Sequence, residues 1–271
     1  LRKYTSDGFQ LASFDDAQWS TIQVPGHWEA QGHGKPDWFQ PNDEVGYYRR
    51  TFAIPGEWHG RHHRLRFEGA NNGAQVWLNG REVGYHEGGV TPFEYDVTPL
   101  VKFGAQNLLA VRVTKHTLTS EYETDDAYFL GGLWRDVYLY SLPADHIEDT
   151  TVRTEFDPVY QNAVLRADLK LRAGNPEIAR ECVVEGTLLD ALGKEVPLES
   201  FRAQVTLGGE GLIPVELNSI VKGPRKWTAE TPYLYTLALR VKCAEKVIQE
   251  VRTSVGFRKV EVKGMRLLVN G

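Results

Sequence analysis

The side chains of this chain that could bind or transform a polar ligand are mainly carboxylates. Residues 123–126 read Glu-Thr-Asp-Asp and form a short acidic stretch. A carboxylate accepts hydrogen bonds through both of its oxygens, which gives Asp125 and Asp126 a chemistry that could serve a polar ligand. Aspartate is usually exposed to solvent, and the residues taken alone therefore favour a solvated acidic loop.

Three histidines close together, His59, His62 and His63, raise the question of a metal site. Metal ligands on a strand favour alternate positions, because alternate residues share a face. His62 and His63 point to opposite faces, so we expect exposed residues at a strand edge and no metal site. The sequence also has no Gly-rich phosphate loop, zinc spacing or nucleophile elbow, and we expect no cofactor.

Composition and charge limit the partners. The chain has 31 Lys and Arg against 36 Asp and Glu, a net charge of −5, which gives no electrostatic reason to expect nucleic acid or an anionic membrane. No apolar run approaches the about 18 residues that a membrane span needs. The aromatic residues, with 7 Trp and 12 Tyr, are typical of a β-rich core. Cys182 and Cys243 lie in apolar runs, and we expect buried free thiols in preference to a disulfide.

The element around which the first half is organised is a β-hairpin at residues 74–85. Val76 and Leu78 alternate with polar or aromatic neighbours, as in a strand. Asn79-Gly80 then predicts a two-residue type I′ turn, because Asn and Gly tolerate the positive φ that this turn requires. Similar alternation predicts further strands at residues 47–54, 63–68, 93–97, 107–114 and 135–141.

The segment 142–145 is a plausible boundary, after which the strands contain few aromatic residues. The predicted strands of the second half are residues 164–171, 182–189, 205–207, 213–217, 234–241 and 247–253. Strands separated by turn residues, with almost no helical periodicity, predict an all-β protein: a sandwich or jelly roll, followed by an immunoglobulin-like sandwich.

Both ends of the sequence suggest a longer gene product. The chain begins at Leu1, its only methionine is Met265, and it ends on Asn270-Gly271, a hairpin signal without a returning strand. We therefore expect missing segments at both ends. The compartment, cytoplasmic or exported, stays open.

Six motifs in order resemble glycoside hydrolase family 2, the β-galactosidase and β-glucuronidase family. They are VPGHW at 24–28, YRRTF at 48–52, VWLNGREVG at 76–84, GGLWRDV at 131–137, KWTAETPYLY at 226–235 and VGFR at 255–258. The resemblance covers nearly the whole chain. It implies a jelly-roll, galactose-binding-like domain over 1–143, an immunoglobulin-like β-sandwich over 144–257, and a lead-in at 258–271 to a (β/α)₈ catalytic barrel.

The resemblance also implies a function. Family chemistry is retaining glycoside hydrolysis by two glutamates, both of which lie on the barrel, so no catalytic residue is expected in this chain. In β-galactosidases of the family, a first-domain loop brings a carboxylate to the sugar. The matching position is Asp126, with Asp125 beside it, and Asn42 is a weaker match for an asparagine in a second loop, because that loop departs from the family pattern.

Two functions remain open. The chain is either the non-catalytic N-terminal region of a β-galactosidase-like enzyme, with the barrel and a β-galactoside as partners, or a stand-alone carbohydrate-binding module. Assembly into homo-oligomers is also left open. The DNA sequence that follows Gly271 distinguishes the two.

We predict no glycosidase activity from these 271 residues alone, because the two glutamates of the family lie on the barrel. The measurement is hydrolysis of aryl β-galactosides and β-glucuronides by the purified chain. Release of the aryl group above a mock-purified blank would contradict the prediction.

Overall fold

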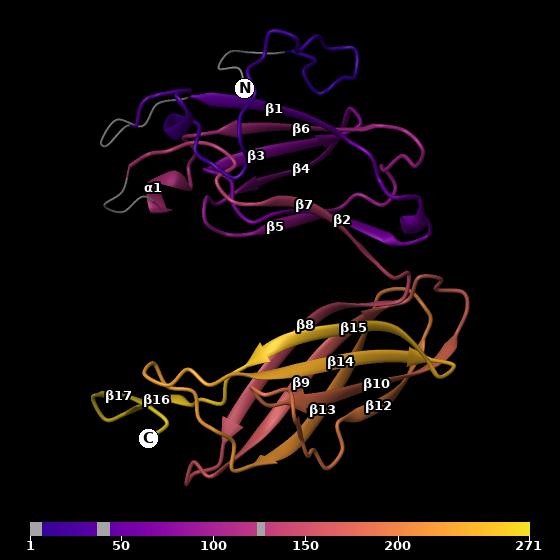
Figure 1. Cartoon of the computed structure of the whole chain (residues 1–271), viewed down its shortest axis with the longest axis vertical. Coiled ribbons are helices and arrows are strands. Elements are labelled where there is room, and N and C mark those ends of the chain that lie inside the picture. The colour runs from indigo at the N-terminus through magenta and orange to yellow at the C-terminus, as the bar shows by residue number, and fades with distance from the viewer. Residues whose placement is uncertain (1–6, 37–43, 124–127) are drawn as a thin grey trace. The chain divides into compact units, whose positions relative to one another are not determined.

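The computed structural model describes residues 7–36, 44–123 and 128–271. The chain divides between Leu142 and Pro143 into two compact units (Figure 1). Each unit is built from antiparallel sheets. The predicted all-β class, a jelly-roll sandwich followed by an immunoglobulin-like sandwich, is confirmed.

Two sheets form the first unit. Its four-stranded sheet has the order β1 (Val45–Phe52), β6 (Asn107–Thr114), β3 (Gly73–Leu78) and β4 (Arg81–Glu87). Its three-stranded sheet has the order β5 (Phe93–Asp96), β2 (His62–Phe67) and β7 (Val137–Leu142). Short helical turns lie in the connections: η1 (Glu29–Gln31), η2 (Gly56–Trp58) and α1 (Ser120–Glu123).

The core of the first unit follows the alternation of the strands. Leu65 and Phe67 on β2 are buried together with Val111 and Val113 on β6, because alternate residues of a strand face the same side. Along β6, Leu108 and Ala110 are buried as well. Phe9 packs with Tyr47 and Ala110 on the outer face of the sheet, where the N-terminal segment crosses β1 (Figure 1).

His63 is buried, which corrects the expectation that these histidines lie exposed at a strand edge. It is 1% exposed and its ring contacts those of Trp58 and Phe103. The physical reason is that β2 is the central strand of its sheet and that His63 shares the inward phase of Leu65 and Phe67.

The predicted hairpin is present, with β3 and β4 joined at Asn79 and Gly80. Both residues have positive φ, 54° and 84°, as a type I′ turn requires. The Asn79 side chain also forms hydrogen bonds to other parts of the sandwich. Its Nδ2 donates to the Leu100 carbonyl (2.8 Å) and to Asn107 Oδ1 (2.9 Å), while its Oδ1 accepts from Leu108 N–H (3.0 Å).

The second unit also contains a sandwich of two sheets. One sheet contains β11 (Glu195–Val196), β10 (Arg180–Leu189), β14 (Tyr235–Cys243) and β15 (Lys246–Val255), with β12 (Arg202–Leu207) also paired to β10. The other has the order β13 (Leu212–Lys222), β9 (Asn162–Arg172) and β8 (His146–Phe156). Strand β8 was not predicted, because its sequence is largely polar and only its ends are buried.

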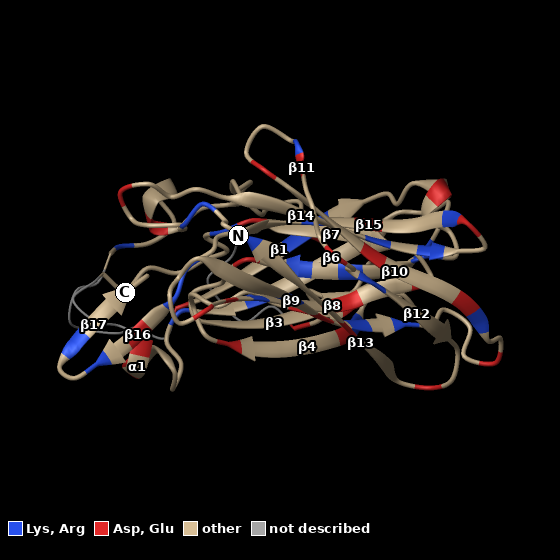
Figure 2. Cartoon of the chain, turned by 90° about the horizontal axis from the view of Figure 1, so that it is seen from below, with Lys and Arg blue, Asp and Glu red and all other residues tan. Residues whose placement is uncertain are grey.

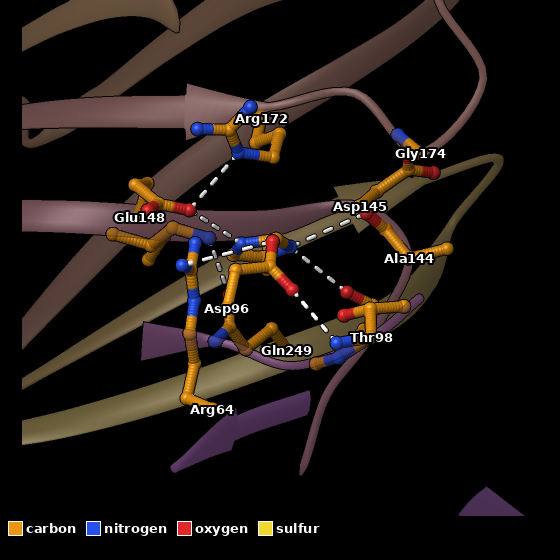
Figure 3. A network of polar contacts seen from close by, with 12 residues as sticks. Arg64, Asp96, Thr98, Ala144, Asp145, Glu148, Arg172, Gly174 and Gln249 are labelled. Atoms are coloured by element: carbon orange, nitrogen blue, oxygen red, sulfur yellow. Dashed lines mark hydrogen bonds and ion pairs between the residues drawn. The ribbon is translucent and has the colours of Figure 1, made fainter. Parts of the chain in front are cut away.

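Polar contacts fix the start of β8 within the second unit. Arg172 on β9 donates to Glu148 at 3.1 Å (Figure 3). Asp145 accepts from Gly174 N–H (2.8 Å) and from the Arg180 guanidinium (2.7 Å). Because β8 has few apolar residues to define its buried face, these polar contacts determine where the strand lies.

Cys182 and Cys243 form a disulfide, and the expectation of free thiols is wrong. The two cysteines are separated by 61 residues, but they are direct partners in the register of β10 and β14. Directly opposite residues of antiparallel strands point to the same face at close range. That register could not be read from the spacing of the cysteines.

The C-terminal residues form a hairpin of β16 (Val260–Lys263) and β17 (Arg266–Val269). Its turn lies at residues 264–265, with Gly264 at φ 63°. Asn270 follows the hairpin: its N–H donates to the Lys259 carbonyl (2.8 Å) and its Nδ2 to the Trp227 carbonyl (3.0 Å). In the structure, Asn270 therefore ties the hairpin to the sandwich.

We predict that Asn79→Ala destabilises the first unit by about 2–4 kcal/mol, since three hydrogen bonds of about 1 kcal/mol each are lost and Ala tolerates positive φ less well than Asn. The measurement is urea denaturation followed by tryptophan fluorescence. The matched control, Asn218→Ala on the exposed face of β13, is expected to change stability by less than about 0.5 kcal/mol. Equal midpoints for the two variants would contradict the prediction.

Candidate functional site

The predicted sugar-binding residues Asn42, Asp125 and Asp126 lie outside the described residues. The structure does describe the chain on both sides of them. Glu44 precedes β1, Glu123 ends α1, and Tyr128 begins the segment that leads to β7. The described part of the candidate site is therefore the framework that holds these flanking residues.

This framework is one end of the first sandwich, which we call the loop end. It consists of residues 26–34, 69–72, 88–92, 115–123 and 128–134. The segments pair through their backbones. Gly26 N–H donates to the Leu133 carbonyl (2.9 Å) and Trp28 N–H to that of Gly131 (3.1 Å), while Asn71 N–H donates to that of Gly132 (2.9 Å).

Trp28 fills the interior of the loop end. Its side chain is almost fully buried, with 1% of the residue exposed, and its indole ring lies directly against Gly131. A Cβ atom at position 131 would lie 2.0 Å from the ring. The glycine is needed at this position because only a residue without a side chain allows the backbone so close to the indole.

A buried ion pair lies beside this contact. Lys115 Nζ is 2.9 Å from Glu29 Oε1 and 3.6 Å from Glu44 Oε2. The side chains of Lys115 and Glu29 are 1% and 0% exposed. Both carboxylate oxygens of Glu29 accept from Gly131 N–H at 3.0 Å.

Glu123 connects α1 to the neighbouring loop. Its Oε2 accepts from Gly89 N–H at 2.6 Å, and the Gly89 carbonyl accepts from the Trp134 indole at 2.8 Å. Arg135 places its guanidinium carbon 4.0 Å from the Trp134 ring centroid and donates to the Val90 carbonyl (3.1 Å). The last described residue before position 124 is thus held by a chain of contacts.

His27 also stacks on the ring of Trp134. The two ring centroids are 5.7 Å apart and the planes differ by 8°. Burial lowers the pKa of His27 below its ordinary value of 6.5, and Glu29 opposes this shift. The imidazole is therefore neutral at pH 7 and packs as an uncharged ring.

Exposed side chains lie on either side of residues 124–127. Leu118 is 76% exposed, Tyr122 87% and Tyr128 57%. Tyrosine rings in this position offer faces on which a sugar ring or another protein surface can pack. We expected most aromatic residues in the core, and these two tyrosines lie outside it.

The ion pair was missed at the sequence level, although a signal was present. Lys115 continues the inward phase of β6, two residues after the buried Val113. A lysine in phase with buried residues needs a charged partner. The partner Glu29 lies far away in sequence, next to a tryptophan, and nothing local identifies it.

Acidic and basic residues are interspersed along the strands, as Figure 2 shows. In the part of the chain that the structure describes, no three His, Cys, Asp or Glu side chains gather as a metal site would require. The helices within residues 7–36, 44–123 and 128–271 include none with the length and apolar character of a membrane span.

We predict that Gly131→Ala destabilises the first unit by about 3 kcal/mol, because the added methyl group overlaps the Trp28 ring. The measurements are thermal denaturation and the tryptophan emission maximum, which is expected to shift to longer wavelength. Gly56→Ala is the matched control, since nothing lies within 4 Å of a Cβ there. A Gly131→Ala variant as stable as the control would show that the indole moves aside freely.

Comparisons with known proteins agree with this architecture. Residues 10–143 match the family described as glycosyl hydrolases family 2, sugar binding domain, and residues 145–258 match glycosyl hydrolases family 2. A β-galactosidase of Priestia megaterium is 33% identical over 97% of this chain, which spans 27% of that relative. The chain thus spans about a quarter of the curated relatives it matches.

Solved structures show the same fold. A family 2 glycosyl hydrolase from Bacteroides cellulosilyticus is 27% identical, with a TM-score of 0.84, over 100% of this chain and 37% of its own. A β-glucuronidase from Bacteroides uniformis has a TM-score of 0.87 at 24% identity, over 100% of this chain and 33% of its own. With two successive family matches and an all-β architecture in agreement, the chain belongs to glycosyl hydrolase family 2.

Proposed function

We propose that this chain is the non-catalytic N-terminal region of a retaining, β-galactosidase-like glycosidase. The observation that carries the proposal is the 33% identity to a β-galactosidase over 97% of the chain. In this proposal the two glutamates of retaining hydrolysis belong to a catalytic barrel, to which residues 258–271 lead. The two sandwiches support that barrel, with the domains at 1–143 and 144–257.

The proposed contribution of this chain to chemistry is substrate binding. Asp126, with Asp125 beside it, would accept hydrogen bonds from sugar hydroxyl groups, since a carboxylate offers two acceptor oxygens. Asn42 would add an amide that both donates and accepts. Such contacts orient the sugar while the glutamates of the barrel carry the bond changes.

Several features of the loop end support this role. Glu44 and Glu123, which border residues 37–43 and 124–127, are fixed by Lys115 and Gly89 respectively. The exposed Tyr122 and Tyr128 flank the second of these segments. A rigid framework with exposed rings beside it suits a loop that meets a sugar and a neighbouring domain.

A single carboxylate is a weak binding site by itself. One or two charge-assisted hydrogen bonds, each worth about 1.5–3 kcal/mol, are opposed by ordering and desolvation costs of similar size. The chain alone is therefore expected to bind a monosaccharide no better than about millimolar. Submillimolar binding of galactose to these 271 residues would favour a stand-alone carbohydrate-binding module.

We predict that Asp126→Ala lowers kcat/KM for an aryl β-galactoside by roughly one to two powers of ten, as the loss of one such contact implies. The experiment uses a protein that extends through the barrel. The matched control is Asp149→Ala, whose carboxylate forms an exposed ion pair with Lys170, and it is expected to leave kcat/KM unchanged. Unchanged kinetics of the Asp126 variant on every accepted substrate would contradict the sugar-binding role.

A further inference from the structure

The buried ion pair of the loop end connects several separate stretches of backbone. Lys115 N–H donates to the Glu44 carbonyl at 3.0 Å, and its Nζ reaches the carboxylates of Glu29 and Glu44. The Lys115 carbonyl accepts from Asn72 Nδ2 at 2.7 Å. Lys115 is thus bound through its backbone and its side chain at the same time.

Glu29 extends the connection to the segment that contains Gly131. Its carboxylate accepts from Gly131 N–H with both oxygens, while Lys115 Nζ lies 2.9 Å from the Oε1 atom. The Trp28 ring lies close to the same glycine, since a Cβ atom at position 131 would be 2.0 Å from it. The pair therefore sets the backbone at Glu44 and Gly131 relative to the end of β6.

Stability alone is a poor explanation for this arrangement. Removing two charges from water is costly, and apolar side chains of similar volume often give equal or greater stability than a buried ion pair. An apolar pair, however, could not accept a hydrogen bond from Gly131 N–H or bind the Glu44 carboxylate. What the ions add is therefore the placement of particular backbone atoms.

We propose that Lys115 and Glu29 are positioning residues for substrate binding, which act by fixing Glu44 and Gly131. This inference rests on the proposed function, because Glu44 directly follows residues 37–43 and Gly131 lies five residues after Asp126. Neither side chain touches the sugar. Their role is to hold the described ends of the two stretches that carry the proposed ligands.

The first test needs only this chain. In Lys115→Met, Glu29 loses its counter-ion and its hold on Gly131 weakens, so the Gly131 amide is expected to exchange its hydrogen at least about tenfold faster. Lys170→Met, which removes an exposed lysine from β9, is the matched control and should leave Gly131 unchanged. Equal protection of Gly131 in the two variants would overturn the proposal.

A second variant keeps the test valid if Lys115→Met does not fold. The double variant Glu29→Gln/Lys115→Met removes both charges and retains the side-chain volumes. The amide side chain introduced at position 29 can still accept from Gly131, but a neutral hydrogen bond is about half as strong as a charge-assisted one. Faster exchange at Gly131 is again expected, and unchanged exchange again overturns the proposal.

The kinetic test uses the protein that extends through the barrel. Positioning predicts that KM for an aryl β-galactoside rises about tenfold in the double variant while kcat changes less than about threefold. A purely structural role predicts the opposite, because a partly unfolded enzyme loses active molecules and lowers the apparent kcat at constant KM. A constant KM therefore overturns the positioning role.

Comparison with Asp126→Ala separates the two proposals. If Asp126→Ala impairs kcat/KM and the double variant leaves KM unchanged, the positioning role is wrong and the proposed function stands. If neither variant alters the kinetics, the proposed sugar-binding role of Asp126 fails and the positioning role with it. Impairment by both variants, with rapid exchange at Gly131, is the result expected.

Discussion

The contact between the Trp28 indole and the Gly131 backbone is the constraint on which the loop end of the first sandwich depends. It brings the segment before η1 against the segment that leads to β7, and the paired backbones of residues 26–28 and 131–133 follow from this approach. The large apolar ring excludes water from the interior. In that dry surrounding, the charges of Lys115 and Glu29 can be satisfied only by each other and by nearby polar groups.

The sequence patterns that predict this fold are short in range. Alternation along β2 and β6 and the Asn79-Gly80 turn each depend on neighbouring residues, and the sequence alone predicts them. Contacts between distant residues were not. The Cys182–Cys243 disulfide depends on the register of β10 and β14, and the burial of His63 depends on β2 being central in its sheet. Burial of both faces of β6 depends on the N-terminal segment crossing the sheet.

At the candidate site, too, the contacts between residues distant in sequence could not be predicted. The resemblance to the family pointed to Asn42, Asp125 and Asp126, which remain predictions. The framework behind them was not predicted, although Lys115 stands in phase with buried residues of β6. A lysine among positions that alternate with buried apolar residues indicates a charged partner. Which residue is the partner depends on how residues 28–31 pack against residue 131, and no local sequence pattern predicts that packing.

The Asn79-Gly80 turn has a consequence for the chemical ageing of this protein. Asn-Gly sequences are prone to deamidation, in which the amide nitrogen of the glycine attacks the asparagine side chain, and asparagine is among the thermolabile residues. In the folded hairpin, the side chain is held by Leu100, Asn107 and Leu108 and is not free to meet that attack. An unfolded chain lacks this protection. Aspartate at position 79 could no longer donate to Leu100 and Asn107, so a molecule that stays unfolded long enough to deamidate loses part of the turn that it needs to refold.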